Sequence, residues 1–454
     1  MMFSRKDLIK ITVPLMIQQV LAVLVSMVDS MMVSSVGEAA ISGVSLIGSL
    51  DMVLIILFSS MVTGGAVVVS QALGQGDKEL VRDSAKQLIY VATGVALAVS
   101  VVVLTFRGPL LHLLFGDAEA AVMQNAMDYF LFMAMSFPFL AVENAGAALF
   151  RSMGDSMTSM LISVGMNLMN VAGNALLIYG CDMGASGAAI STLFARVVGA
   201  VVALVLLHNK KNPIYLERIL HYRPDFRIIR RILRIGIPSG IENSMFQFGK
   251  LMTQSLISSM GTVSIAANAV ALNLVNFQYM PGNAIGLAIV TVVGRCIGAG
   301  ERVQAKKYAR GFLLTTYCCL WAINLATLLL ADPLISLYQP SEETARLVKF
   351  LLLFHAGVTG VIWPIAFTTP HAFRAASDVK FPLVVSIVSM WVFRVAFGYV
   401  LSMETIDLFG FSFPGFGLGI SGVWIAMFSD WIFRAILFGI RFFSGKWLTK
   451  YKKE

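Results

Sequence analysis

The sequence predicts an all-α integral membrane protein of about twelve transmembrane helices, arranged as two six-helix repeats. Composition, an internal repeat and the alternation of basic loops predict this fold. Of the 454 residues, 57% are hydrophobic and only 13% are charged, which excludes an ordinary soluble domain. Apolar stretches of about 20 residues or more, long enough to cross ~30 Å of hydrocarbon, recur along the whole chain.

The internal repeat is visible because the segment around Pro14 recurs around Pro238, 224 residues later. The matching segments of the two halves are Ser34–Gly37 with Ser258–Gly261, Gly74–Asp77 with Gly298–Glu301, and, with the offset reduced by one, Phe150–Asp155 with Phe373–Asp378. A membrane chain that contains two copies of one unit is typical of a secondary transporter, whose site lies between the halves.

The predicted spans follow one another with short connections. In order, they cover roughly residues 8–35, 44–70, 87–106, 126–150, 157–180, 186–208, 232–258, 265–294, 312–331, 349–373, 380–402 and 418–443. We therefore predict an N-terminal six-helix lobe over 1–208, a basic cytoplasmic linker over 209–231, and a C-terminal six-helix lobe over 232–454. The first span is too long for a signal-peptide core, so we expect it to stay in the mature protein.

Two further patterns describe the connections and the helices themselves. The segment 71–86 and its copy 295–310 each predict a glycine turn followed by a short amphipathic cytoplasmic helix. Prolines fall inside several spans and predict kinks there. The backbone carbonyl groups that each proline frees must then accept hydrogen bonds from neighbouring helices or water. These prolines are Pro14, Pro138, Pro238, Pro281, Pro364 and Pro370.

Basic residues concentrate in alternate connections. Lys78, Arg82 and Lys86 lie in one connection, whereas Glu119 and Glu342 lie in connections of the opposite kind. By the positive-inside rule, both termini are predicted in the cytoplasm of a multi-pass cell (inner or plasma) membrane protein. The net charge of +9 then reflects membrane orientation, so we expect the lipid bilayer and not nucleic acid as a partner.

The sequence lacks the motifs that would indicate an enzyme. The four cysteines have neither metal-ligand nor redox spacing, and the G-x-G turns have no flanking strand to make a nucleotide fingerprint. The loops also offer no cluster of catalytic side chains. We expect no enzymatic activity, no catalytic residue, no resident metal and no cofactor beyond H+ or Na+ as a coupling ion, and we expect a monomer.

Asp29 is the most informative ionisable residue of the first half. A charge at mid-membrane costs roughly 2.5–3.5 kcal/mol on insertion scales, and no basic residue lies three or four positions from Asp29. On the fifth span, Asn170 and Asn174 belong to one polar stripe at helical spacing. An acid among neutral partners is suited to binding a proton or Na+. The alternative is a purely structural acid, satisfied by neighbouring hydroxyls and amides.

Polar stripes also mark the second half. Glu242, Gln247 and Lys250 lie on the seventh span, and Asn273 and Asn276 lie on the eighth. This lining predicts a pocket for a small organic, cationic substrate, with Glu242 attracting the cation and Lys250 opposing a second positive charge. A packed polar core is the alternative.

Four other charged residues are predicted to be neutralised locally. Asp430 and Arg434 stand four apart on the last span, which is typical of a self-neutralising pair on one helix face. Arg394, like Arg196 in the first half, is predicted to pair with an acid or with carbonyls at a helix end.

Taken together, these motifs resemble the multidrug and toxic compound extrusion (MATE) family over nearly the whole chain. The proline-led first and seventh helices match, as do the G-x-G-[DE] turns, the Phe-Arg-x-x-x-Asp pattern after the fourth and tenth helices, and the segment Gly187–Thr192. The charged D-x-x-G-R-type loop of the major facilitator carriers, the other common six-plus-six fold, is absent at 71–86.

The resemblance implies two lobes in a V shape and export of organic cations and drugs in exchange for H+ or Na+, without ATP. In one bacterial branch of the family, the cation network of the first lobe would fall on Asp29, Asn170, Asn174 and Thr192. That branch usually has an aspartate where this chain has Asn174, which removes one charge. In another branch, acids on the seventh and tenth helices would fall at or near Phe246 and Trp363. A lipid-linked sugar flippase of the related superfamily is the alternative function.

Overall fold

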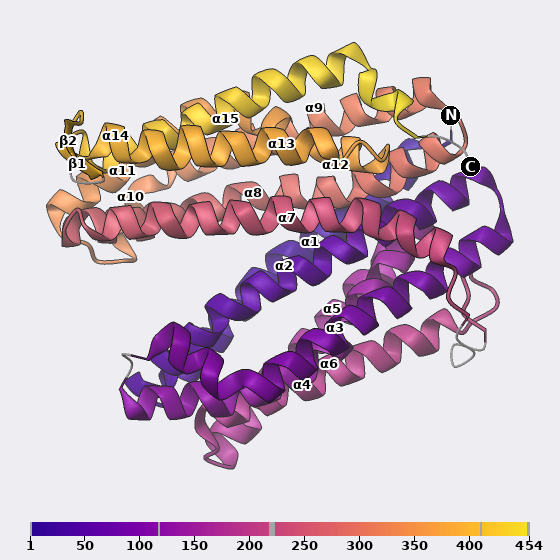
Figure 1. Cartoon of the computed structure of the whole chain (residues 1–454), viewed down its shortest axis with the longest axis horizontal. Helices are drawn as coiled ribbons and strands as arrows, with labels where there is room; N and C mark the ends of the chain where they lie inside the picture. Colours follow the sequence, from indigo (N-terminus) through magenta and orange to yellow (C-terminus); the bar gives the residue numbers. More distant parts are fainter. Residues whose placement is uncertain (1, 117–118, 218–222, 409–410, 452–454) are drawn as a thin grey trace. The chain divides into compact units, whose positions relative to one another are not determined.

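The computed structural model describes residues 2–116, 119–217, 223–408 and 411–451, and nearly all of their regular structure is helical (Figure 1). The chain forms two compact units, Met1–Gly240 with Gly298–Gly300, and Ile241–Ile297 with Glu301–Glu454. Within the described ranges, eleven helices are long and apolar enough to cross a membrane. The predicted all-α membrane fold class is therefore confirmed.

The first unit is built around helix α4. Its elements are α1 (Arg5–Ser34), α2 (Glu38–Gln75), α3 (Lys78–Phe115), α4 (Ala120–Met153), α5 (Ser156–Asn174), the π-helical turn η1 (Ala175–Gly180) and α6 (Gly184–Leu207). Helix α4 packs against α2, α3 and α6, while α5 packs against α1 and α6. Small buried residues such as Gly146 and Ala203 let α4 and α6 approach closely. This packing holds α1, α5 and α6 together.

The connection between α2 and α3 is tighter than the sequence predicts. Helix α2 continues to Gln75, and α3 begins at Lys78, so the loop and short helix predicted over 71–86 are instead the ends of two long helices. Gly76 closes α2 at φ 77°, a left-handed conformation that favours glycine. The side chain of Asp77 then accepts hydrogen bonds from the backbone N–H groups of Glu79 and Leu80, both at 3.0 Å, which caps α3.

Helix α7 (Phe226–Ser258) covers the seventh predicted span and begins inside the stretch 209–231 predicted as a linker. At 33 residues it is long enough to cross a membrane. It is not among the eleven apolar helices, because it carries four arginines near its start and Glu242, Gln247 and Lys250 further along. A helix this polar needs partners or water along its length.

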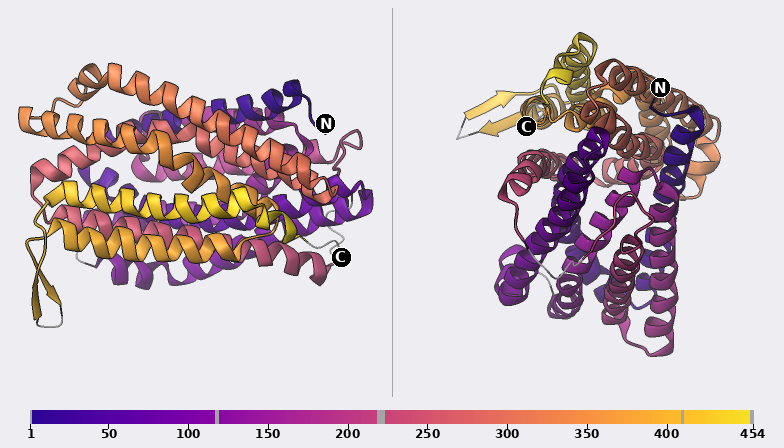
Figure 2. Two further views of the ribbon diagram at one scale, coloured as in Figure 1. Left: turned by 90° about the horizontal axis from the view of Figure 1, so that it is seen from above. Right: turned by 90° about the vertical axis from the view of Figure 1, so that its right-hand side faces the viewer.

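The second unit contains the rest of the chain. Its elements are α7 from Ile241 onward, α8 (Thr262–Gly298), α9 (Arg302–Leu329), α10 (Ala331–Ser336), α11 (Glu342–Trp363), η2 (Pro364–Thr368), α12 (Thr369–Ala375), α13 (Lys380–Val388), η3 (Ser389–Ala396), α14 (Phe397–Ser402), β1 (Thr405–Leu408), β2 (Phe411–Pro414), α15 (Gly419–Ser444) and η4 (Lys446–Thr449). Helix α11 packs against α9 and α15. The sequence did not predict the antiparallel hairpin β1–β2, which projects from the helices in both views of Figure 2.

The two halves repeat one another down to the geometry of a single turn. After α4, Gly154 has φ 85° and the N–H of Asp155 donates to the carbonyl of Phe150 at 2.9 Å. After α12, Ser377 has φ 63° and the N–H of Asp378 donates to the carbonyl of Phe373 at 2.8 Å. The Phe-Arg-x-x-x-Asp pattern is therefore a repeated helix-ending turn, closed by the same backbone hydrogen bond.

Candidate functional site

The four residues predicted as a coupling network come together inside the first unit. Asp29 lies on α1, Asn170 and Asn174 on α5, and Thr192 on α6. The side-chain amide of Asn174 donates to Asp29 Oδ1 at 2.9 Å. Asn170 and Asn174 are buried, and Asp29 is half-buried. We call these four residues the Asp29 cluster.

The amide of Asn170 completes the cluster when its nitrogen faces the carboxylate. In that orientation the nitrogen lies 3.0 Å from both oxygens of Asp29, and the amide oxygen accepts from the backbone N–H and the hydroxyl of Thr192 at 3.3 and 3.0 Å. Such an orientation is chosen by the hydrogen-bond pattern. It gives Asp29 only neutral donors, and no Lys or Arg pairs with it in the part of the chain that the structure describes.

The cluster depends on an unusually close approach of α5 and α6. A Cβ atom on Gly173 would lie 2.3 Å from the hydroxyl oxygen of Ser191. That hydroxyl donates to the backbone carbonyl of Asn170 at 2.7 Å. Immediately after Asn174, the helix changes to the π-helical turn η1, a distortion that is frequent at functional sites. Glycine at 173 thus permits the contact that positions Asn170 and Thr192.

The substitution Gly173→Ala is expected to push α5 away from α6 and to disturb the Asp29 cluster. Overpacking of this kind costs about 1–3 kcal/mol, so the apparent melting temperature in detergent should fall and export should decline. Gly165→Ala is the matched control, because it lies on the same helix and a Cβ there meets nothing within 4 Å. The control should be neutral or slightly stabilising. Equal behaviour of the two variants would contradict this account of Gly173.

Asp51, another acid of the first unit, is paired with Arg196, which the sequence predicts to pair with an acid or with carbonyls at a helix end. Arg196 on α6 lies 3.5 Å from Asp51 on α2 and donates to Ser136 on α4 at 2.7 Å. All three side chains are buried. This pair is separate from the Asp29 cluster, and it neutralises Asp51.

In the second unit, Glu242 does not present a free carboxylate. Arg374, from the Phe-Arg motif, donates to one of its oxygens at 2.9 Å, and Ser386 donates to the other at 2.9 Å. Glu242 and Arg374 are both buried. In this conformation the carboxylate is therefore satisfied inside the unit, which argues against its predicted role of attracting a cationic substrate.

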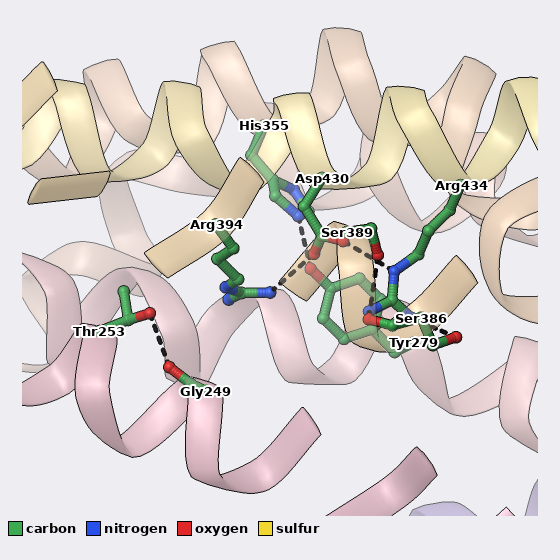
Figure 3. Close-up of polar contacts among 9 residues, drawn as sticks. All are labelled: Gly249, Thr253, Tyr279, His355, Ser386, Ser389, Arg394, Asp430 and Arg434. Atoms are coloured by element: carbon green, nitrogen blue, oxygen red, sulfur yellow. Dashed lines mark hydrogen bonds and ion pairs between the residues drawn. The ribbon is translucent and has the colours of Figure 1, made fainter. Parts of the chain in front are cut away.

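The hydroxyl of Ser386 links the ion pair of Glu242 to a larger buried network. Figure 3 shows Ser386, Arg394, Asp430 and Arg434 of this network. Arg434 donates to Asp430 at 2.7 Å and to the hydroxyl of Ser386 at 3.2 Å. On its other side, Asp430 lies 3.7 Å from Arg394. The predicted pair of Asp430 and Arg434 is confirmed, as is the prediction that Arg394 pairs with an acid. Figure 3 also shows Tyr279 and His355 beside this network, joined by a 2.7 Å hydrogen bond.

The remaining predicted residues of the second half are less buried than this network. Lys250, Asn273 and Asn276 are exposed, and Gln247 is half-buried. Asn268 donates to Gln254 at 3.2 Å, which fixes the register of the antiparallel α7–α8 pair. Lys250 and Gln247 precede Gln254 on α7, and Asn273 and Asn276 follow Asn268 on α8 by similar numbers of residues. Because each residue rises about 1.5 Å along a helix, Asn273 lies near the height of Lys250, and Asn276 near the height of Gln247.

Sequence reasoning missed the contribution of Arg374 and Ser386. Both lie more than 130 residues from Glu242, and no periodicity relates positions so far apart. One signal was available, because Arg374 is the arginine of the repeated Phe-Arg motif, and its counterpart Arg151 is also directed inward, donating to Ser159 at 3.1 Å.

Long apolar helices in two units, each with polar and charged side chains held in its interior, define a multi-pass membrane transport protein. The MatE family model matches this chain twice, over residues 14–176 and 238–400. The chain therefore belongs to the MatE family. The two matches start at Pro14 and Pro238, the positions from which the 224-residue repeat was recognised.

Curated relatives and solved structures agree with this assignment. The chain is 28% identical to the "Probable multidrug resistance protein NorM" of Thermotoga maritima over 98% of this chain and 93% of that protein. It is 27% identical to the "Uncharacterized transporter YisQ" of Bacillus subtilis, over 98% and 95%. It superposes with TM-score 0.87 and 20% identity on an outward-facing multidrug resistance MATE family transporter, over 97% and 96%. At that identity the structure shows the fold alone.

Proposed function

We propose that this chain is a secondary active efflux antiporter, which exports small organic compounds in exchange for H+ or Na+ by alternating access. The observation that carries the proposal is the Asp29 cluster, an acid inside a membrane unit whose partners are neutral amides. A single negative charge among neutral groups can bind and release one cation at moderate cost. The names of the relatives, which include multidrug resistance proteins, support export of foreign organic compounds.

The same proposal gives the other sequence predictions their roles. Both termini lie on the cytoplasmic side of the cell membrane, as the basic loops predict. Substrate meets the polar face formed by Gln247, Lys250, Asn273 and Asn276.

The proton is the preferred coupling ion, because Asn174 supplies no second carboxylate and because the amide nitrogens facing Asp29 would have to turn away before Na+ could bind.

Export from a bacterial host that lacks its own pumps tests the proposal. Cells that produce the protein should accumulate less norfloxacin than cells with an empty vector, and an uncoupler that collapses the proton gradient should remove the difference. If the difference persists in the uncoupler but disappears without external Na+, the coupling ion is Na+. If no member of a broad panel of compounds is exported, the proposal fails and transfer of a lipid-linked sugar becomes the better hypothesis.

A further inference from the structure

We propose that the exposed face around Lys250 binds an anionic group, so that the compounds recognised by the second unit carry a carboxylate or a comparable anion. This inference rests on the proposed export function and names the substrate class of the same site. It replaces the cationic preference that Glu242 suggested from sequence.

Three cations surround one aromatic ring. The ammonium nitrogen of Lys250 lies 5.1 Å from the ring centroid of Phe246, and the guanidinium carbons of Arg434 and Arg394 lie at 4.9 and 5.7 Å. Cation–π contacts of this kind lower the cost of holding a cation away from water. They do not neutralise its charge, so the positive field remains.

The nearby acids do not balance these cations. Glu242 is engaged by Arg374, and Asp430 is shared between Arg434 and Arg394. In this network the structure thus describes four cations, Lys250 and the three arginines, against two acids, which leaves two positive charges in excess. Arg394 also has a buried Nε atom with no hydrogen-bond partner. Buried positive charge without a counter-charge is costly, and an incoming anion would offset part of that cost.

Lys250 is the cation that a ligand can reach. It is exposed, whereas Arg374, Arg394 and Arg434 are buried, and no acid of the described residues forms an ion pair with it. The exposed amides of Asn273 and Asn276 lie at the same height along the α7–α8 pair. An ammonium group and amide donors at the same height of one helix pair are the kinds of donor from which a carboxylate accepts hydrogen bonds.

A matched set of three naphthalene compounds tests the inference without any ion gradient. 1-Naphthoate, neutral 1-naphthamide and 1-naphthylmethylammonium share one ring and differ in charge. Equilibrium dialysis with the purified full-length protein in detergent should show 1-naphthoate binding at least about tenfold more tightly than the ammonium compound. Lys250→Met should remove that preference and leave the binding of the amide unchanged. Lys250→Arg should retain the preference, and Lys78→Met, at the exposed start of α3, should have no effect.

The alternatives are distinguishable. Tighter binding of the ammonium compound, equal loss of all three ligands in Lys250→Met, or no binding of any of them would overturn the inference. A protein that binds 1-naphthoate through Lys250 but exports nothing would instead contradict the proposed export function, because dialysis requires no transport. Size-exclusion chromatography establishes that each variant is folded.

Discussion

Replacement of Asp29 by asparagine is expected to reduce gradient-driven export by roughly 100-fold or more, while the protein stays folded and still binds substrate. An ion gradient can drive the transporter only through a group that binds the ion with different affinity in its two conformations. To move the conformational equilibrium almost completely from one state to the other, the ion must bind one state about 10⁴-fold more tightly than the other. Asparagine has almost the same volume as aspartate but can neither take up a proton nor attract Na+ with a charge. Its amide can still hydrogen-bond with Asn170 and Asn174.

Reconstituted vesicles with an imposed pH gradient, and separately with an imposed Na+ gradient, measure this effect. Asp7→Asn is the matched control, because Asp7 lies on the same helix but forms a capping box with Ser4 at the exposed N-terminus of α1. The control should transport at close to the wild-type rate. If Asp29→Asn pumped normally under either gradient, the cluster would be structural, and the coupling site would have to be sought elsewhere in the chain.

Features that depend on local spacing could be predicted from the sequence. The pair of Asp430 and Arg434 follows from a separation of four on one helix, and the stripe of Asn170 and Asn174 correctly identified one face of α5 as polar. Asp29 was singled out because no base lies within one helical turn of it. Thr192 was found only through resemblance to a family, since a lone threonine carries no signal of its own.

Features that depend on tertiary packing could not be predicted. The ion pair of Glu242 with Arg374 joins residues 132 positions apart, and it exists because α7 and α12 both contribute to the interior of the second unit. In this packing the carboxylate of Glu242 is the counter-charge of Arg374. Hairpin β1–β2 and the turn η1 were missed because apolar periodicity alone does not distinguish short strands or π-helical turns from ordinary helix.

The largest expected loss of stability is that of Asp430→Asn. Asp430 is fully buried, and its carboxylate lies 2.7 Å from Arg434 and 3.7 Å from Arg394. Removing its charge leaves two buried guanidinium groups without their shared counter-ion. Breaking a buried ion pair costs about 3–5 kcal/mol, which for a unit of this size corresponds to a fall in apparent melting temperature of roughly 10 °C.

Asp332→Asn is the control that separates the effect of burying an ion pair on stability from the effect of losing any ion pair. Asp332 also forms an ion pair, accepting from Lys349 at 2.7 and 2.9 Å, but both side chains are exposed. Exposed pairs contribute about 0–1 kcal/mol, so Asp332→Asn should move the melting temperature by no more than about 4 °C. Thermal unfolding of both variants in the same detergent makes the comparison direct. A small shift for Asp430→Asn would mean that water or a neighbouring group already compensates the two arginines, and the excess of positive charge assigned to this network would have to be revised.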